Sequence, residues 1–135
     1  MIKEFRRRFF FLSNFYEEFD GKTLEHRFQA AKADNWDDFL RVMNAPTPSE
    51  AKRLGRKVSL RHDWEWIKDQ IMYGLIVVKF TDPDLRELLL DTGEQYLQEG
   101  NSWGDTYWGV SLTTGLGENK LGKILMRHRA ELQKD

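Results

Sequence analysis

The stretch from residue 64 to residue 80 constrains the fold most, because its apolar residues recur at helical spacing over about four turns. The apolar positions stand three and four residues apart and are Trp64, Ile67, Ile71, Leu75 and Val78. From Leu75 to Val78 every residue is apolar, so we expect this helix to pass through the centre of the domain. Asp63 is placed to cap its N-terminus.

Other helices are marked by N-terminal signals. Thr47 can cap a helix that has Pro48 at its first position and Glu50 to complete a capping box. Asp82 precedes a proline in the same way, and Asn119 can cap a last helix that includes Leu121 and Leu125 on its buried face. The helices predicted in this way cover residues 24–34, 36–43, 48–55, 64–80, 83–93 and 120–133.

Extended structure is expected mainly near the N-terminus. Short strands are predicted at residues 2–7 and around 19–23, the second beside the turn dipeptide Asp20-Gly21. Residues 96–111 lack helical period and are predicted to form a loop with short extended pieces. The sequence therefore predicts a mainly helical α+β fold with a small N-terminal β element, in a single domain over residues 1–135.

Composition excludes several classes of protein. The chain has 135 residues, no cysteine and a formal charge of -1, so it contains neither disulfides nor a thiolate zinc site. The near-zero charge argues against holding long nucleic acid by phosphate contacts, although Arg6, Arg7 and Arg8 form a local basic excess. The three histidines share no metal spacing with carboxylates, so we expect neither a metal nor a cofactor. No membrane-spanning stretch or signal peptide is found, and we expect a cytoplasmic protein without membrane partners.

One helix face could carry chemistry. Glu25, Gln29 and Lys32 fall within about 60° of one another on the helix predicted over residues 24–34. They stand beside its apolar face, where a cleft would half-bury them. A half-buried carboxylate can act as an acid or base, and a half-buried lysine can act as a nucleophile. The alternative is an ordinary amphipathic helix with solvated charges.

Two glycine-rich segments are further candidates. The loop Asn101 to Trp108 carries two tryptophans, a tyrosine and Asp105, which could contact a ribose hydroxyl or a developing positive charge. Alternatively, its aromatic residues fold the loop back onto the core. Glycines 115 and 117 precede the last predicted helix, and the N–H groups at the start of that helix could bind phosphate. Alternatively, the glycines form a simple turn and cap. A basic set that could also bind phosphate comprises Lys52, Arg53, Arg56, Lys57 and Arg61.

Taken together, these segments resemble the YbiA/NADAR family over nearly the whole chain. The motifs that carry the resemblance stand in the family's order. They are F-L-S-N-F-Y at residue 11, D-G-K-T-L-E-H-R-F-Q-A-A-K at 20, T-P-S-E-A-K-R-L-G-R at 47, R-H-D-W at 61, L-L-L-D-T-G at 88, D-T-Y-W-G at 105 and N-K-L-G-K-I-L-M-R-H-R at 119.

The resemblance implies a mainly helical α+β fold of about six to seven helices and hydrolysis of N-glycosidic bonds. Glu25 matches the family's essential glutamate, Lys32 the lysine after the glutamine, and Asp105 the aspartate of D-x-x-W-G. These three are the catalytic candidates. The substrate-binding candidates are Asn14, Phe15, Gln29, Lys52, Arg61, Trp64, Trp108, Gly109 and Asn119.

Two substrate classes follow from the resemblance. The primary hypothesis is removal of ADP-ribose from guanine bases in nucleic acid or nucleoside, and an ADP-ribosyltransferase toxin is then the implied partner. The alternative enzyme cleaves ribosylamino, phosphoribosyl-type intermediates of riboflavin synthesis. A non-catalytic ADP-ribose-binding module and a purely structural helical domain remain alternatives of other classes.

Overall fold

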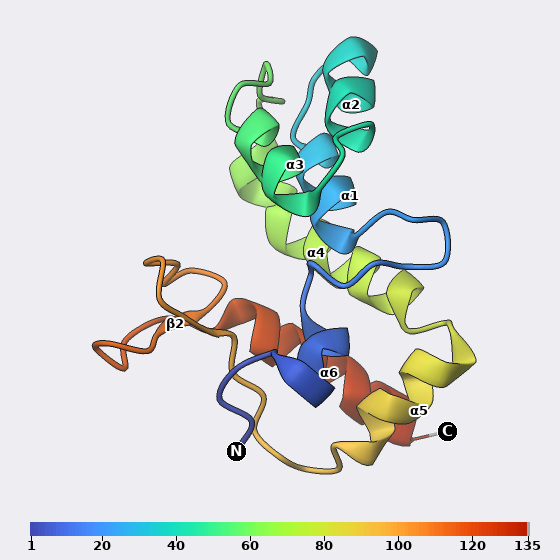
Figure 1. Cartoon of the computed structure of the whole chain (residues 1–135), viewed down its shortest axis with the longest axis vertical. Helices are drawn as coiled ribbons and strands as arrows, with labels where there is room; N and C mark the ends of the chain where they lie inside the picture. The colour runs from blue at the N-terminus through green and yellow to red at the C-terminus, as the bar shows by residue number, and fades with distance from the viewer. Residues whose placement is uncertain (135) are drawn as a thin grey trace. The chain divides into compact units, whose positions relative to one another are not determined.

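The computed structural model describes residues 1–134, which form two compact units: Met1–Ser13 with Ile76–Asp135, and Asn14–Leu75. The elements in chain order are the 3-10 helix η1 (Arg7–Leu12), α1 (Leu24–Ala31), α2 (Trp36–Met43), α3 (Pro48–Gly55), α4 (Trp64–Lys79), α5 (Pro83–Asp91), β1 (Gly100–Asn101), β2 (Val110–Ser111) and α6 (Lys120–Gln133) (Figure 1). The mainly helical α+β class is confirmed. The expectation of a single domain stays a prediction.

The unit Asn14–Leu75 is built around α1, against which α2 and α3 pack (Figure 1). Small and branched residues of these helices and of the α2–α3 connection form one buried cluster, namely Ala30, Val42, Ala45 and Ala51. Thr23 caps α1, and α2 and α3 are capped by Asn35 and Thr47. Short helices with defined caps and small core residues can approach closely, which fixes the face that α1 turns toward α3.

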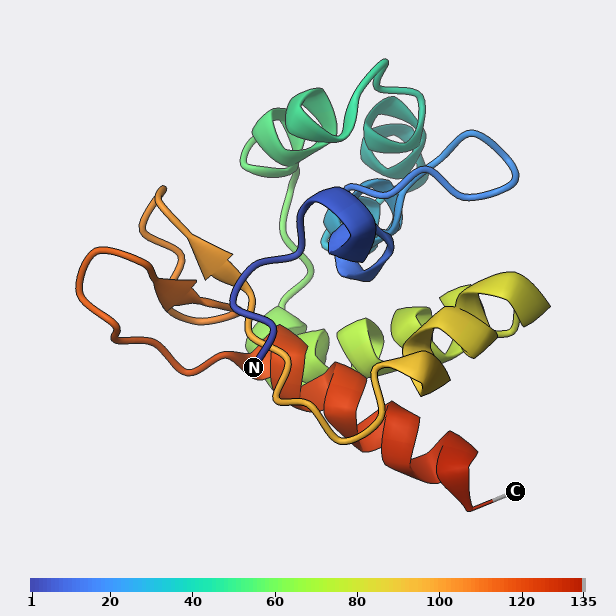
Figure 2. The same ribbon diagram turned by 60° about the horizontal axis from the view of Figure 1, so that its bottom comes forward.

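The unit Met1–Ser13 with Ile76–Asp135 contains α5 and α6, which pack together, and the two short strands (Figure 2). Asp82 caps α5 by accepting from the N–H groups of Asp84 and Leu85. The strands β1 and β2 pair in parallel, with Gly100 opposite Val110. Leu121 and Leu125 of α6 are buried, as its apolar spacing predicts.

The N-terminal strands and the buried face of α4 differ from the sequence expectations. The paired strands lie between residues 100 and 111, while the N-terminal stretches contribute only the isolated bridges Ile2–Leu97 and Glu17–Thr23. Residues 7–12 form η1. On α4 the buried residues include Met72 and Ile76, whereas Val78 is 62% exposed. Among residues 1–134, none of the helices has both the length and the apolar character needed to cross a membrane.

Candidate functional site

Glu25 lies in the first turn of α1 and is only 7% exposed. Its backbone N–H donates to the carbonyl oxygen of Asn14 at 3.0 Å. The first turn of a helix favours a carboxylate, because the N-terminal peptide dipoles present positive charge there. The fold therefore tolerates a buried negative charge at this position.

Gln29 follows one turn later and orients that carboxylate. Its Nε2 donates to Oε1 of Glu25 at 2.9 Å, and the side chain is 6% exposed. Gly55 of α3 packs directly on the Gln29 amide, so that a Cβ at residue 55 would lie 2.9 Å from Cδ of Gln29. The amide oxygen Oε1 of Gln29 is buried and has no hydrogen-bond partner. The packing of α3 thus fixes the rotamer of Gln29, and with it the Glu25 contact.

Lys32 caps the C-terminus of α1 and is half-buried. Burial lowers the pKa of its amine below the ordinary value of 10.5, and the positive charges of Arg56, Lys52 and Lys68 lower it further, while Glu25 opposes them. A lowered pKa increases the fraction of neutral, nucleophilic amine near neutral pH. Glu25 and Lys32 are therefore electrostatically coupled, as their helical spacing predicts.

Asn14 supplies a second unsatisfied oxygen. Its Nδ2 contacts Sδ of Met72 at 3.6 Å, and its buried Oδ1 has no partner. Buried amide oxygens are almost always hydrogen-bonded, so an unpartnered one marks this position as a candidate for contact with a substrate. Phe15, the next residue, is half-buried.

The remaining candidates in this unit play visible packing or pairing roles. Trp64 is 5% exposed and packs on Phe28, with ring centroids 5.0 Å apart. A ring buried in this way is better suited to lining a cleft than to stacking on a substrate base. Arg61 pairs with Asp63 at 2.6 Å, and Lys52 is half-buried on α3. Their roles in holding substrate stay predictions.

Asp105 lies in the other unit and organises its own loop. Its Oδ1 accepts from the N–H groups of Tyr107 and Trp108 at 3.1 and 3.0 Å. The Asn101 side chain bonds to both backbone groups of Asp105: its Oδ1 accepts from the Asp105 N–H, and its Nδ2 donates to the Asp105 carbonyl. The Trp108 ring meets Tyr107 edge-on. The carboxylate therefore has a local structural role, and its catalytic role stays a prediction.

The start of α6 differs from what its sequence suggests. Asn119 adopts a left-handed conformation at φ 53° and makes no side-chain cap. Its buried amide instead accepts from the Glu99 N–H and donates to the Leu97 carbonyl, both at 2.9 Å. It cannot cap the helix because the side chain is committed to the segment before β1.

The N–H groups proposed to bind phosphate at α6 are also engaged. Those of residues 118, 119, 120 and 121 donate to the carbonyls of Thr106, Gly109, Tyr107 and Trp108. Gly109 is required here, since a Cβ would lie 2.7 Å from Nδ2 of Asn101. Because these N–H groups are already hydrogen-bonded to backbone carbonyls, the segment before α6 fits the simple-turn alternative. That this loop meets Glu25 and Lys32 stays a prediction.

Sequence reasoning missed several residues around the α1 cluster, the group formed by Glu25, Gln29 and Lys32 on one face of α1. His26 completes the α1 capping box with Thr23 and contacts the Ala45 carbonyl through Nε2 at 3.0 Å. Because a carbonyl only accepts, Nε2 carries the proton and Nδ1 accepts from Thr23. Gly55 and Lys68 were missed because only tertiary packing brings them to α1. In residues 1–134, no three His, Asp or Glu side chains are grouped to hold a metal ion.

Comparisons with known proteins agree on one family. The NADAR domain matches residues 3–133. An N-glycosidase from Nostoc punctiforme is 42% identical over 117 residues, covering 82% of this chain and 74% of that protein. The N-glycosidase YbiA from Escherichia coli is 39% identical over 119 residues, covering 84% and 73%.

A riboflavin biosynthesis protein from Vibrio vulnificus is 37% identical over 132 residues, covering 91% of this chain and 35% of that protein. The solved NMR structure of E. coli YbiA superposes with a TM-score of 0.84 at 34% identity, covering 98% of this chain and 83% of that one. The chain belongs to the NADAR family. Its relatives support the same class of activity for this chain, hydrolysis of N-glycosyl bonds.

Proposed function

We propose that this N-glycosidase removes ADP-ribose from guanine bases, in nucleic acid or in nucleosides. The observation that carries the proposal is the α1 cluster, in which a buried carboxylate, Glu25, is coupled to an amine of lowered pKa, Lys32. The positive charges of Lys52, Arg56 and Lys68 act on the same amine. Lys68 also pairs with Glu65, and this group of cations suits a diphosphate better than a single phosphate.

The chemistry follows from the charge that the reaction develops. As the bond between the ribose anomeric carbon and the guanine nitrogen breaks, positive charge builds on the sugar ring and the bond's electron pair leaves with the nitrogen, which takes up a proton. Glu25 stabilises the positive ring and orients the water that adds to the anomeric carbon. Of the two unsatisfied oxygens, that of Gln29 is covered by Gly55, so we assign Oδ1 of Asn14 as the acceptor for a ribose hydroxyl or a base N–H group.

A covalent route uses Lys32. Its neutral amine attacks the anomeric carbon, the ribose ring opens, and an imine forms as the base nitrogen leaves with a proton. Water then hydrolyses the imine and releases ADP-ribose. Borohydride reduction during turnover traps this imine, and absence of an adduct at Lys32 removes the covalent route while leaving the Glu25 route intact.

A second substrate class is favoured by the names of two relatives, the riboflavin biosynthesis proteins of Vibrio vulnificus and of Zea mays. Cleavage of ribosylamino intermediates breaks the same type of bond. For the ADP-ribose substrate, the enzyme that installs the modification, an ADP-ribosyltransferase toxin, is the expected partner system.

The deciding experiment incubates the protein with ADP-ribosylated guanosine and, separately, with a phosphoribosylamino-pyrimidine, and measures the products by mass spectrometry. We expect ADP-ribose and guanosine from the first substrate. Release only from the second reassigns the enzyme to riboflavin intermediates. Binding of ADP-ribose by both wild type and Glu25→Ala, with turnover of neither substrate, identifies a non-catalytic binding module.

A further inference from the structure

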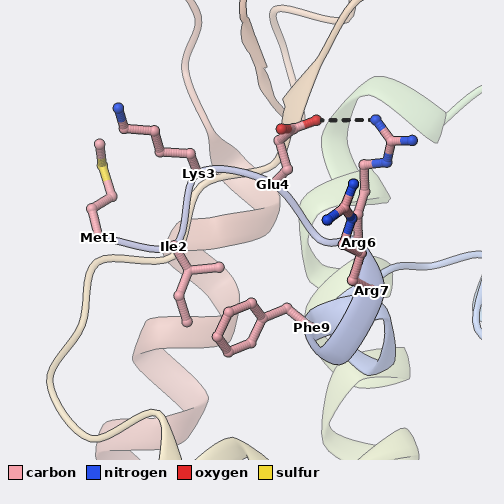
Figure 3. A pocket seen from close by; sticks show the side chains of 7 residues that line it. All are labelled: Met1, Ile2, Lys3, Glu4, Arg6, Arg7 and Phe9. Carbon is pink, nitrogen blue, oxygen red and sulfur yellow. Dashed lines mark ion pairs between the residues drawn. The ribbon is translucent and has the colours of Figure 1, made fainter.

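An open cavity of about 380 Å³ lies at the N-terminal segment, in the unit Met1–Ser13 with Ile76–Asp135. Its lining residues are Met1, Ile2, Lys3, Glu4, Arg6, Arg7 and Phe9 (Figure 3). The floor is apolar, with Ile2 buried and Phe9 half-buried, whereas the cationic side chains stand exposed around it. The size falls at the lower end of the range for small-ligand sites.

The charge of this segment contrasts with that of the chain. Lys3, Arg6, Arg7 and Arg8 are exposed, and the one acidic residue lining the cavity is Glu4, which lies 3.6 Å from the Arg6 guanidinium. The whole chain has a formal charge of -1. An exposed basic excess in an otherwise balanced chain attracts polyanions locally.

Backbone strain at the same place is a second, independent observation. Arg7 has φ 56°, in the left-handed region that a long side chain rarely occupies. The only other such non-glycine residue in the described chain is Asn119, a residue type that tolerates this region. Strain held at an exposed arginine is typical of functional positions, because packing alone would favour glycine there.

Aromatic residues interleave with the basic ones. The Arg8 guanidinium lies over the Phe9 ring, 4.7 Å from its centroid, and Phe10 is 41% exposed. A positive surface that tracks phosphates, combined with aromatic faces on which bases stack, is the usual pattern of single-strand binding proteins. A duplex hides those base faces, so the aromatic residues favour a single strand.

We propose that the N-terminal basic surface, formed by Lys3, Arg6, Arg7, Arg8 and Phe9, binds the sugar-phosphate backbone and bases of single-stranded nucleic acid. This inference deepens the proposed function and rests on it for one point only, that the bound strand carries the modified guanine. The surface then selects a strand, and the α1 cluster performs the hydrolysis.

The direct test measures binding of a labelled single-stranded oligonucleotide of about 12 nucleotides by fluorescence anisotropy over a range of salt concentrations. The variant Arg6→Gln/Arg7→Gln/Arg8→Gln is expected to bind at least about tenfold more weakly, with a log–log salt slope smaller by about 2. A matched variant, Arg86→Gln/Lys123→Gln/Arg127→Gln, removes the same charge from exposed positions of the same unit and is expected to bind like wild type. Equal affinity of wild type and both variants overturns the proposal.

Arg7→Gly separates binding from folding. Glycine accepts the left-handed conformation, so the melting temperature is expected to be no lower than that of wild type, while the oligonucleotide binds more weakly. Unchanged binding by Arg7→Gly, with weakened binding by the triple variant, limits the surface to Lys3, Arg6 and Arg8 and contradicts the assignment of Arg7. Anionic vesicles and a duplex are further probes. Binding to vesicles but not to the oligonucleotide, or tighter binding of the duplex, overturns the single-strand assignment.

Activity provides the link to the proposed function. The triple variant is expected to lose about tenfold in kcat/KM on an ADP-ribosylated oligonucleotide while keeping its rate on ADP-ribosylated guanosine, which has no strand to bind. Equal loss on both substrates contradicts a strand-binding role. If wild type releases ADP-ribose from neither substrate, the proposed function fails, and the anisotropy experiment still decides the binding surface by itself.

Discussion

The α1 cluster and the loop between β1 and α6 are equally conspicuous in the sequence but differ in how their polar groups are satisfied. In the loop, the Asp105 carboxylate and the Asn119 amide bond to nearby backbone groups. In the α1 cluster, by contrast, the Gln29 amide oxygen is buried without a partner, and the pKa of the Lys32 amine is lowered. Satisfied polar groups hold a structure together, whereas unsatisfied or electrostatically strained ones are available for a substrate.

From this comparison we propose that the α1 cluster carries the chemistry and that the loop gives structural support. Removing the charged side chains Glu25 or Lys32 should therefore change turnover with little loss of stability, and substitutions in the loop should do the reverse.

Among the tests of the covalent route, Lys32→Met gives the largest expected change in activity. Loss of the nucleophilic amine lowers kcat by about 100-fold or more and abolishes borohydride trapping. Stability should not fall. The folded-state pKa of Lys32 lies below its ordinary value, so below that folded pKa the charged amine opposes folding, and stability rises with pH toward 10.5. A variant that still traps substrate, or whose melting temperature at pH 7 drops, contradicts this assignment.

Asn119→Ala gives the largest expected change in stability. It leaves the Glu99 N–H and the Leu97 carbonyl without their partner, which costs about 2–3 kcal/mol in chemical denaturation. Asn119→Gly loses the same bonds but accepts the left-handed backbone, so its loss should be smaller. If the folded variants instead show an increased KM at low temperature, Asn119 contacts substrate and the loop is more than structural support.

Gly55→Ala tests the contact that orients Glu25. The new Cβ displaces the Gln29 amide, lowering kcat by about tenfold and stability by about 1–3 kcal/mol. Gly74→Ala is the matched control on α4, because a Cβ at residue 74 meets nothing within 4 Å. The control should keep full activity and gain about 0.5–1 kcal/mol. Full activity in Gly55→Ala would show that the Gln29 contact does not matter for turnover.

Arg56→Gln is expected to have the smallest effect, a shift in pH dependence. Removing this positive charge raises the pKa of Lys32, so the acidic limb of the kcat/KM profile moves to higher pH if the neutral amine reacts. Arg53→Gln on the same helix is the control, because Arg53 is paired with Glu50. Identical pH profiles of kcat/KM for the two variants would show that Lys32 does not take part in the reaction.

Local signals predicted much of the fold. The caps at Thr47 and Asp82 and the helix over residues 36–43 are found where the sequence places them, because each depends on neighbouring residues alone. The buried face of α4 was less predictable. An all-apolar run from Leu75 to Val78 carries no period, so its packing partners decide that Ile76 is buried and Val78 is exposed.

The candidate site shows the same division. Helical spacing alone places Glu25, Gln29 and Lys32 on one face, and the structure couples them. No sequence spacing relates Gly55, Arg56 or Lys68 to that face, because they come from α3 and α4. Asn119 looked like an ordinary cap, and only the segment around Leu97 shows why its amide is used elsewhere.

The most direct test compares two isosteric charge removals, Glu25→Gln and Asp105→Asn, by mass-spectrometric measurement of ADP-ribose release from ADP-ribosylated guanosine. Both substitutions keep an oxygen that can accept the hydrogen bonds now made to the carboxylate. The account predicts that Glu25→Gln lowers kcat by about 100- to 1,000-fold at unchanged melting temperature, while Asp105→Asn keeps kcat near that of wild type. Near-normal turnover by Glu25→Gln, with loss of turnover by folded Asp105→Asn, would contradict it.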